Sequence, residues 1–207
     1  MRIIEPGILG YRESLELQRS IHREVREGRG EETLILLRHP PVITLGRSAK
    51  RENILVSEEI IKKLGVEIYE VERGGDVTFH GPGQWVGYPI IDLRKRGKDI
   101  HLYLRNLEEV IIKVLANFGL AGKRIPGLTG VWVGEKKIAS IGVAVRGWVT
   151  YHGFSFCIKP EKEYFSLINP CGLGKEMTSL EEELGKKIDM EKVKEVIKEE
   201  FLNIFQS

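Results

Sequence analysis

Cys171 is the residue whose type and setting most favour covalent chemistry. It lies between Pro170 and Gly172, two residues that prevent a helix or strand from continuing. A thiol on such a rigid turn is accessible and fixed in direction, as a nucleophile needs to be. Cys157, by contrast, lies in the apolar run Phe-Ser-Phe-Cys-Ile, where a cysteine usually acts as a small buried hydrophobe. The sequence therefore favours a nucleophilic role for Cys171 and a structural role for Cys157.

A nucleophilic thiol needs a partner that takes its proton or stabilises the thiolate. The candidates are His80, His152 and Lys137. Along the strand expected from Lys137, alternation places this lysine on the bulkier apolar face, together with Ala139, Ile141, Val143 and Val145. The opposite face then carries Lys136, Ile138, Ser140 and Gly142. Loss of water on the apolar face would favour the neutral amine, although a strand-end lysine that reaches solvent fits the same pattern.

The segment Arg73–Gln84 reads Arg-Gly-Gly-Asp-Val-Thr-Phe-His-Gly-Pro-Gly-Gln, and five of its twelve residues are glycine or proline. It lies between two apolar runs, Val66–Val71 and Trp85–Leu93, which we expect to be strands. A turn between two strands needs only about two to five residues. The excess of glycine predicts a loop whose backbone N–H groups approach a ligand closely. A long solvent loop with a bulge is the alternative.

The remaining pattern predicts the elements that position these residues. Apolar residues at helical spacing, with their flanking caps, predict helices over 11–26, 57–64, 101–118 and 190–205, and a capping box predicts another from Ser179. Strands are expected over 33–37, 42–45, 131–133, 137–145 and 153–158. Because the strands cluster between the helices, we predict an α+β fold, with a mixed, largely antiparallel β-sheet flanked by helices.

Composition narrows the class of protein. The 207 residues most simply form one domain, 1–207, and the formal net charge of +2 gives no sign of nucleic-acid binding. No apolar run approaches the roughly 20 residues that a membrane span needs, and the first residues do not resemble a secretory signal, so we expect a cytoplasmic protein. The histidines are widely spaced, and neither a Cys-x-x-Cys pair nor a nucleotide-binding motif occurs. We therefore expect no metal and no cofactor.

Several sequence blocks together resemble the lipoyl(octanoyl) transferase family. The four main blocks are His39–Arg47, Arg73–Gln84, Lys137–Val143 and Asn169–Leu173, and two shorter ones are Thr129–Val133 and Tyr151–Gly153. These blocks occur in the family order and span most of the chain. Within the second block, Asp76 and Phe79 depart from the glutamine and tyrosine that some relatives carry.

The resemblance implies a reaction and its partners. An octanoyl group would pass from octanoyl-acyl carrier protein to a lysine of lipoyl domains, in 2-oxoacid dehydrogenases and in the glycine cleavage H protein. In that family, the residue matching Cys171 is acylated and the residue matching Lys137 assists as acid and base. The implied fold is the one shared with biotin and lipoate protein ligases.

The same resemblance implies an apolar tunnel for the octanoyl tail. We expect the residues at its mouth to be Arg73, Gly74, Gly75, His80 and Gly83, and those that help close the site to be Gly142 and His152. Because acyl carrier proteins and lipoyl domains are acidic in general, two basic runs are candidate docking surfaces, Arg94–Lys98 and Lys123–Arg124. Solvated loops would have the same composition.

Other functions share part of this pattern. An ATP-dependent lipoate–protein ligase has the same architecture, but it would not need Cys171 and tends to carry a longer glycine run. A related octanoyl amidotransferase uses a cysteine placed elsewhere in the chain. A thioesterase could use His80 as its base. A non-catalytic module that binds lipoyl domains would keep the glycine loop but have no use for both Cys171 and Lys137.

Overall fold

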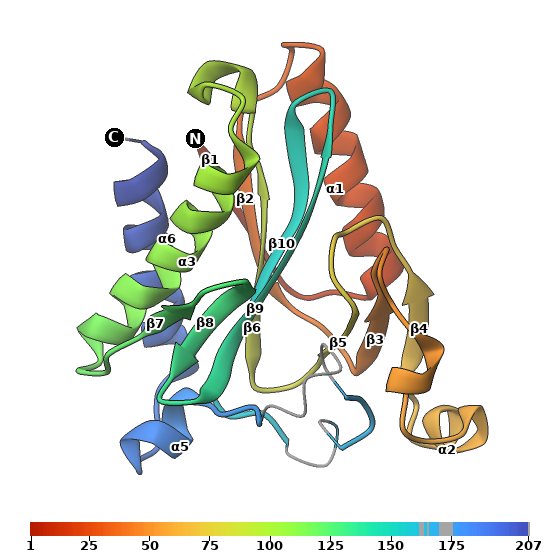
Figure 1. Ribbon diagram of the computed structural model, residues 1–207. Helices are drawn as coiled ribbons and strands as arrows, with labels where there is room; N and C mark the ends of the chain where they lie inside the picture. The colour runs from red at the N-terminus through yellow and green to blue at the C-terminus, as the bar shows by residue number, and fades with distance from the viewer. Residues whose placement is uncertain (162–163, 165, 170–175, 207) are drawn as a thin grey trace.

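The strands of this protein form two sheets of unequal size (Figure 1). The computed structural model describes residues 1–161, 164, 166–169 and 176–206, so the predicted nucleophile Cys171 lies outside the described residues. The larger sheet has the order β1 (Arg2–Ile8), β2 (Thr33–Arg38), β6 (Gln84–Ile90), β10 (Val149–Cys157), β9 (Lys136–Arg146), β8 (Leu128–Val133) and β7 (Lys123–Ile125). The smaller sheet has the order β4 (Glu67–Glu70), β3 (Val42–Leu45) and β5 (Val77–His80).

Most neighbouring strands are antiparallel, as in the pairs β2 with β6, β6 with β10 and β10 with β9. Two pairs are parallel, β1 with β2 and β3 with β4. A parallel pair needs a crossover connection, which helix α1 (Tyr11–Arg26) supplies between β1 and β2. The predicted α+β fold with a mixed, largely antiparallel sheet is therefore confirmed.

Alternation along β2 separates two helical layers. Leu34 and Leu36 pack in the cluster that contains α3 (Ile100–Asn117) and α6 (Met190–Phe205), whereas Ile35 and Leu37 pack in the cluster that contains α1. Figure 1 shows α3 and α6 on one side of the larger sheet and α1 on the other. The apolar spacing that predicts these three helices is thus the spacing that buries them.

The helix ends also follow the sequence. Ser57 caps α2 (Glu58–Lys63) by accepting the Ile60 N–H, and Ser179 caps α5 (Leu180–Leu184) by accepting the Glu182 N–H. Gly119, after α3, has a φ of +81°, the left-handed conformation expected there. Two short 3₁₀ turns, η1 (Arg51–Asn53) and η2 (Leu93–Arg96), complete the helical elements of the described residues. None of the described helices is long and apolar enough to cross a membrane.

The glycine-rich segment Arg73–Gln84 differs from its prediction as a single loop. Its residues Val77–His80 form β5, which pairs with β3 so that Phe79 lies opposite Ile43. The residues of this segment before β5 therefore form the loop, whereas Val77–His80 belong to the smaller sheet. Two other strands, β1 and β7, are also absent from the prediction, and both lie at edges of the larger sheet, where pairing on one side alone holds them.

Candidate active site

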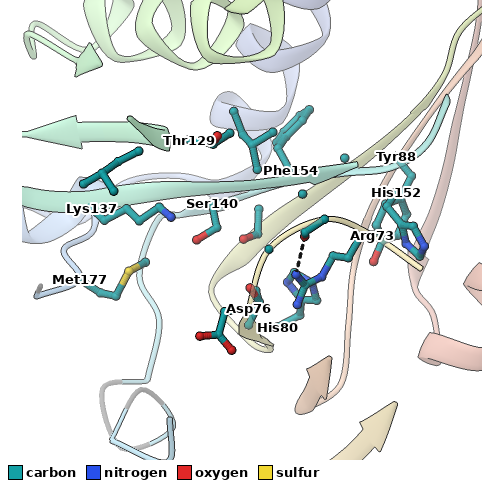
Figure 2. A pocket seen from close by; sticks show the side chains of 18 of the residues that line it. Arg73, Asp76, His80, Tyr88, Thr129, Lys137, Ser140, His152, Phe154 and Met177 are labelled. Carbon is teal, nitrogen blue, oxygen red and sulfur yellow. Dashed lines mark hydrogen bonds between the residues drawn. The ribbon is translucent and has the colours of Figure 1, made fainter. Parts of the chain in front are cut away.

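A cavity of about 200 Å³ lies where the loop before β5 passes over β9 and β10 (Figure 2). The structure brings seven of the predicted site residues to its wall, namely Arg73, Gly74, Gly75, His80, Lys137, Gly142 and His152. Figure 2 shows the Lys137 side chain entering from one end and His152 with Tyr88 at the other. Blocks that are far apart in the sequence thus converge on one space.

Gly83 is not among the residues that line this cavity. Its carbonyl accepts the N–H groups of Ile158 and Lys159, each at 3.0 Å, so it ties the start of β6 to the end of β10. Its φ of +81° and the nearby Lys159 carbonyl leave no room for a side chain. We expected Gly83 to line the tunnel mouth. In the structure it lies instead in the turn between β5 and β6.

Lys137 reaches the cavity because of a β-bulge. Trp132 pairs with Lys137 and Val131 pairs with Ala139, so Ile138 is an extra residue on β9. The extra residue reverses the alternation, and Lys137 lines the cavity beside Ser140 and Gly142. The prediction that Lys137 shares a face with Ala139 is therefore wrong, because strict alternation does not hold across a bulge.

The Lys137 side chain is held along its length. It is only 8% exposed, and its Nζ lies 5.3 Å from the centre of the Trp132 ring, a cation–π distance. Its stem passes Gly130, where an added Cβ would lie 2.6 Å from Cε of the lysine. The Gly130 N–H donates to the buried Glu108 carboxylate at 3.1 Å, which fixes this part of β8. A side chain at position 130 would therefore occupy the space that the Lys137 side chain fills.

The chain enters and leaves the undescribed Pro-Cys-Gly segment at anchored residues. Asn169 donates its N–H to the Asn53 carbonyl at 2.8 Å. Five residues after Cys171, the Glu176 carbonyl accepts the Lys137 N–H at 2.9 Å, and Met177 lines the cavity. The described residue that resumes the chain after the predicted nucleophile is thus hydrogen-bonded to the predicted acid–base lysine.

Arg73 holds the glycine loop in place through hydrogen bonds. Its guanidinium donates to the Thr44 carbonyl at 2.7 Å and to the Gly74 carbonyl at 3.0 Å. The Gly74 N–H donates to the Val143 carbonyl on β9 at 2.9 Å. A Cβ on Gly142 would lie 2.9 Å from the Gly74 carbonyl oxygen, so the absence of a side chain lets the loop approach β9. Arg73 and these two glycines therefore shape the wall of the cavity.

His152 has an unusual backbone at the far end of the cavity. Its φ of +56° places a non-glycine residue in the left-handed region, which costs free energy that surrounding contacts must offset. One such contact is the N–H bond to the Gln18 side-chain oxygen, at 2.9 Å. Neither ring nitrogen has a hydrogen-bond partner among the described residues, and the nearest Glu72 oxygen is 3.7 Å away. The structure thus holds His152 in a strained conformation with its ring at the cavity wall.

Burial makes the cavity histidines weak bases. It lowers the pKa of His152 to about 4, with the Arg73 charge acting in the same direction. Burial, with the His39 and Arg73 charges, also lowers the pKa of His80 well below its usual value. Both rings are therefore neutral at pH 7 and hold a proton poorly.

His39, behind the cavity, makes stability depend on pH. Its Nδ1 donates to the Leu9 carbonyl at 2.7 Å, so its Nε2, 2.8 Å from the Tyr88 hydroxyl, accepts in the neutral ring. Burial lowers the pKa of His39 from 6.5 to about 4. The unfolded chain therefore binds more protons between these values, and the stabilisation present above pH 6.5 is lost as the pH falls towards 4.

We expect the free energy of unfolding to fall by about 1–2 kcal/mol through His39 alone between pH 7 and pH 5. Urea unfolding of the wild type and of His39→Asn at both pH values measures this contribution as the difference between their pH dependences. An equal pH dependence in both proteins would contradict the assignment.

Several residues of the site have only weak sequence signals. Tyr11, Tyr88 and Trp132 line the cavity, and their patterns predict only core positions. Gln18 lies on the inward stripe of α1, seven residues after Tyr11, and is fully buried. A polar residue on an apolar stripe is the signal that could have identified it.

The two departures from the family pattern have structural roles. Asp76 accepts the N–H groups of Lys50 and Val77 and the side-chain amide of Asn53, which fixes the loop before β5. Phe79 stacks on Tyr164 with ring centres 5.0 Å apart. Among the described residues, no group of three or more histidine, cysteine, aspartate or glutamate side chains is arranged to hold a metal ion.

Comparison with solved structures identifies the fold. The chain superimposes on a lipoate-protein ligase A bound with ATP with a TM-score of 0.82 at 17% identity, covering 99% of this chain and 85% of that one. The biotin protein ligase of Aquifex aeolicus, solved with biotin and ATP, gives a TM-score of 0.55 at 11% identity, covering 99% and 70%. The fold is therefore the lipoate and biotin protein ligase fold.

Sequence comparison identifies the family. Residues 10–202 match the lipoyl protein ligase A/B catalytic domain, and the chain belongs to this family. It is 50% identical over 188 residues to the octanoyltransferase of Rubrobacter xylanophilus, covering 89% of this chain and 84% of the relative. It is 47% identical over 204 residues to the octanoyltransferase of Thermoanaerobacter pseudethanolicus, covering 98% and 89%. The resemblance seen in the sequence motifs is thus confirmed.

Proposed function

We propose that this protein transfers an octanoyl group from an acyl carrier protein to a lysine of lipoyl domains, through a thioester on Cys171. The single observation that carries the proposal is the cavity that joins Lys137 to the loop before β5, in a chain whose relatives are octanoyltransferases. The resumption of the chain beside Lys137, five residues after Cys171, supports the pairing of the two residues.

The first half-reaction moves the acyl group between two sulfur atoms. The Cys171 thiolate attacks the octanoyl carbonyl, the bond from that carbon to the carrier sulfur breaks, and the departing carrier thiolate takes a proton from Lys137. As an ammonium, Lys137 also favours the thiolate of Cys171. Because one thioester replaces another, the step is close to balanced in free energy. Backbone N–H groups of Cys171 or Gly172 are candidates to stabilise the tetrahedral oxyanion.

The second half-reaction forms an amide. The lysine amine of the lipoyl domain attacks the Cys171 thioester, a carbon–nitrogen bond forms, and the carbon–sulfur bond breaks. Lys137, now neutral, accepts the proton that the attacking amine loses. Since an amide is more stable than a thioester, this step draws the sequence forward without ATP. The net reaction converts an octanoyl thioester and an amine into an octanoyl amide and a free carrier thiol.

The cavity would hold the octanoyl tail beyond Lys137. Its wall includes Leu128, Trp132 and Phe154, and burial of each methylene stabilises binding by roughly 0.8 kcal/mol. Seven carbons beyond the carbonyl could therefore contribute several kcal/mol. In this arrangement the neutral rings of His80 and His152 lie along the tail and take no part in proton transfer.

Intact-mass measurement tests the proposed intermediate. Wild-type protein mixed with octanoyl-carrier should gain one octanoyl group without ATP, and Cys171→Ser should gain none. Cys157→Ala is the matched control, because Cys157 is buried and outside the proposed chemistry, so this variant should be acylated like the wild type. Acylation that requires ATP and free octanoate would instead identify a ligase. No acylation under either condition would identify a binding module.

Gly74 provides a test of the tail-binding site. Gly74 lines the cavity, its φ is not positive, and an added Cβ would have a single neighbour within 4 Å, the Val143 carbonyl at 3.7 Å. Gly74→Val should therefore fill part of the cavity and lower kcat/KM for octanoyl donors by about tenfold or more, while hexanoyl donors lose less. Gly74→Ala should give an intermediate ratio. Equal losses for both chain lengths would place the tail elsewhere.

A further inference from the structure

A second pocket of about 200 Å³ lies between α1 and the β9–β10 hairpin, outside the catalytic cavity. We call it the arginine pocket, and its wall consists of Arg19, His22, Arg23, Arg26, Glu72, Arg146 and Tyr151. Figure 1 shows α1 alongside β10 in this region. Four guanidinium groups and one carboxylate line this pocket. The pocket is therefore strongly positive, although the formal net charge of the whole chain is only +2.

The spacing of α1 builds this charge. Arg19, Arg23 and Arg26 follow the i, i+4, i+7 pattern, so they share one face of the helix. Arg19 pairs with Glu72 at 2.5 Å. The side chains of Arg23, Arg26 and Arg146 have no hydrogen bond or ion pair in the described part of the chain. Burial lowers the pKa of His22, and the positive charges of Arg26 and Arg146 lower it further.

The basic runs that the sequence offers as docking surfaces carry less free charge. Arg94 pairs with Asp92 at 2.8 Å, and Lys123 pairs with Glu135 at 2.8 Å. Arg124 pairs with both Glu108 and Glu109. Arg96 pairs with Glu32, so that only Lys95 and Lys98 of the six cations in the two runs have no carboxylate partner among the described residues. In the arginine pocket, three of the four arginines have none.

Distance along β9 indicates which partner fits. Tyr151 lies opposite Ala144, and Ala144 is seven residues after Lys137 on the same strand, which corresponds to about 23 Å. A target lysine side chain is far too short to span this, so a lipoyl domain must sit closer to Lys137. The phosphopantetheine arm of a carrier is comparable to about five extended residues and reaches roughly 17 Å. The Lys137 side chain extends from β9 and shortens the remaining distance. The arm can therefore reach from the arginine pocket to the Lys137 amine.

We propose that the arginine pocket is the docking surface for the acidic face of the acyl carrier protein, from which the thioester arm extends to the Lys137 end of the cavity. This inference rests on the proposed function. Complementary charge of this kind acts mainly on the rate of encounter and is weakened by salt.

A charge-reversal variant, Arg23→Glu with Arg146→Glu, tests the surface. We expect KM for octanoyl-carrier to rise by about tenfold or more, and the salt dependence of KM to flatten. The rate from octanoyl-pantetheine, a thioester without protein or phosphate, should stay within about twofold of the wild type. The matched control is Lys113→Glu with Lys192→Glu, which changes the net charge equally on α3 and α6, across the sheet. It should leave KM for the carrier nearly unchanged.

Two outcomes would overturn the inference. One is an equal rise in KM in both double variants, which would reflect net charge alone. The other is a rise in KM for the lipoyl domain in place of the carrier. If the double variant does not fold, hydrogen exchange of the wild type with excess carrier answers the question, with protection expected over 19–26 and 146–151 and its absence contradicting the surface. A wild type inactive with both octanoyl-carrier and octanoyl-pantetheine would refute the proposed function itself.

Discussion

Replacing Lys137 with methionine is expected to lower the rate of octanoyl transfer by about 10²–10⁴-fold, the range that general acid–base catalysis contributes. Methionine keeps an unbranched stem that can pass Gly130 and pack on Trp132, so the loss isolates the amine. The two half-reactions can be followed separately, by intact mass for acylation of the enzyme and by modification of a lipoyl domain for the transfer. Both should slow, because Lys137 is proposed to move a proton in each.

The folding control for Lys137→Met is thermal unfolding, with a Tm expected within a few degrees of the wild type. Lys137→Arg adds a second comparison, because it preserves the positive charge but cannot accept a proton at neutral pH. It should retain part of the acylation rate and little of the transfer to lysine. A Lys137→Met rate within about tenfold of the wild type would assign proton transfer to another group, such as His80.

Replacing Gly130 with alanine should impair catalysis without touching a reacting atom. The added Cβ would lie 2.6 Å from Cε of Lys137 and 2.7 Å from the Ala139 carbonyl oxygen, so the lysine must move. A displacement of this size at a catalytic group lowers rates by about 10- to 100-fold. Overpacking and the φ of +135° should also reduce the free energy of unfolding by about 1–3 kcal/mol. Steady-state kinetics and urea unfolding measure the two effects.

Gly134→Ala separates backbone strain from the effect on Lys137. Gly134 lies in the turn between β8 and β9, has a φ of +56°, and an added Cβ there would meet nothing within 4 Å. It should lower stability through strain while leaving kcat near the wild-type value. Similar kinetic losses in the Gly130 and Gly134 variants would show that the hairpin as a whole, and not the space for the lysine, governs activity.

The parts of the fold that sequence predicts well are those with strong local patterns. The spacing of apolar residues defines α1, α3 and α6 to within one or two residues, because the same residues that mark the pattern fill the core. The strands β1, β5 and β7 are not predicted because each lies at the edge of its sheet, where it pairs on one side alone, and because β5 and β7 are short. Their residues carry no pattern that distinguishes a strand from a loop.

For the site, the motifs predict which residues lie around one cavity. They do not predict the strand pairing and the contacts that orient those residues. Arg73, Gly74 and His80 reach one cavity with Gly142 and His152 as expected from the shared blocks. The bulge at Ile138 is set by pairing with β8, and alternation within β9 alone points Lys137 to the wrong face. The contact between Gln18 and the His152 backbone spans 134 positions, and only the folded chain brings the two together.

The buried cysteine has a practical consequence. Cys157 is 1% exposed, and burial raises its pKa to about 12, so its thiolate is scarce at neutral pH. A thiol-reactive dye should consequently consume no more than one equivalent per folded chain, and a second equivalent should react only after the sheet between β6 and β9 opens. The rate of that second reaction, measured under native conditions, would report how often the end of β10 separates from its neighbouring strands.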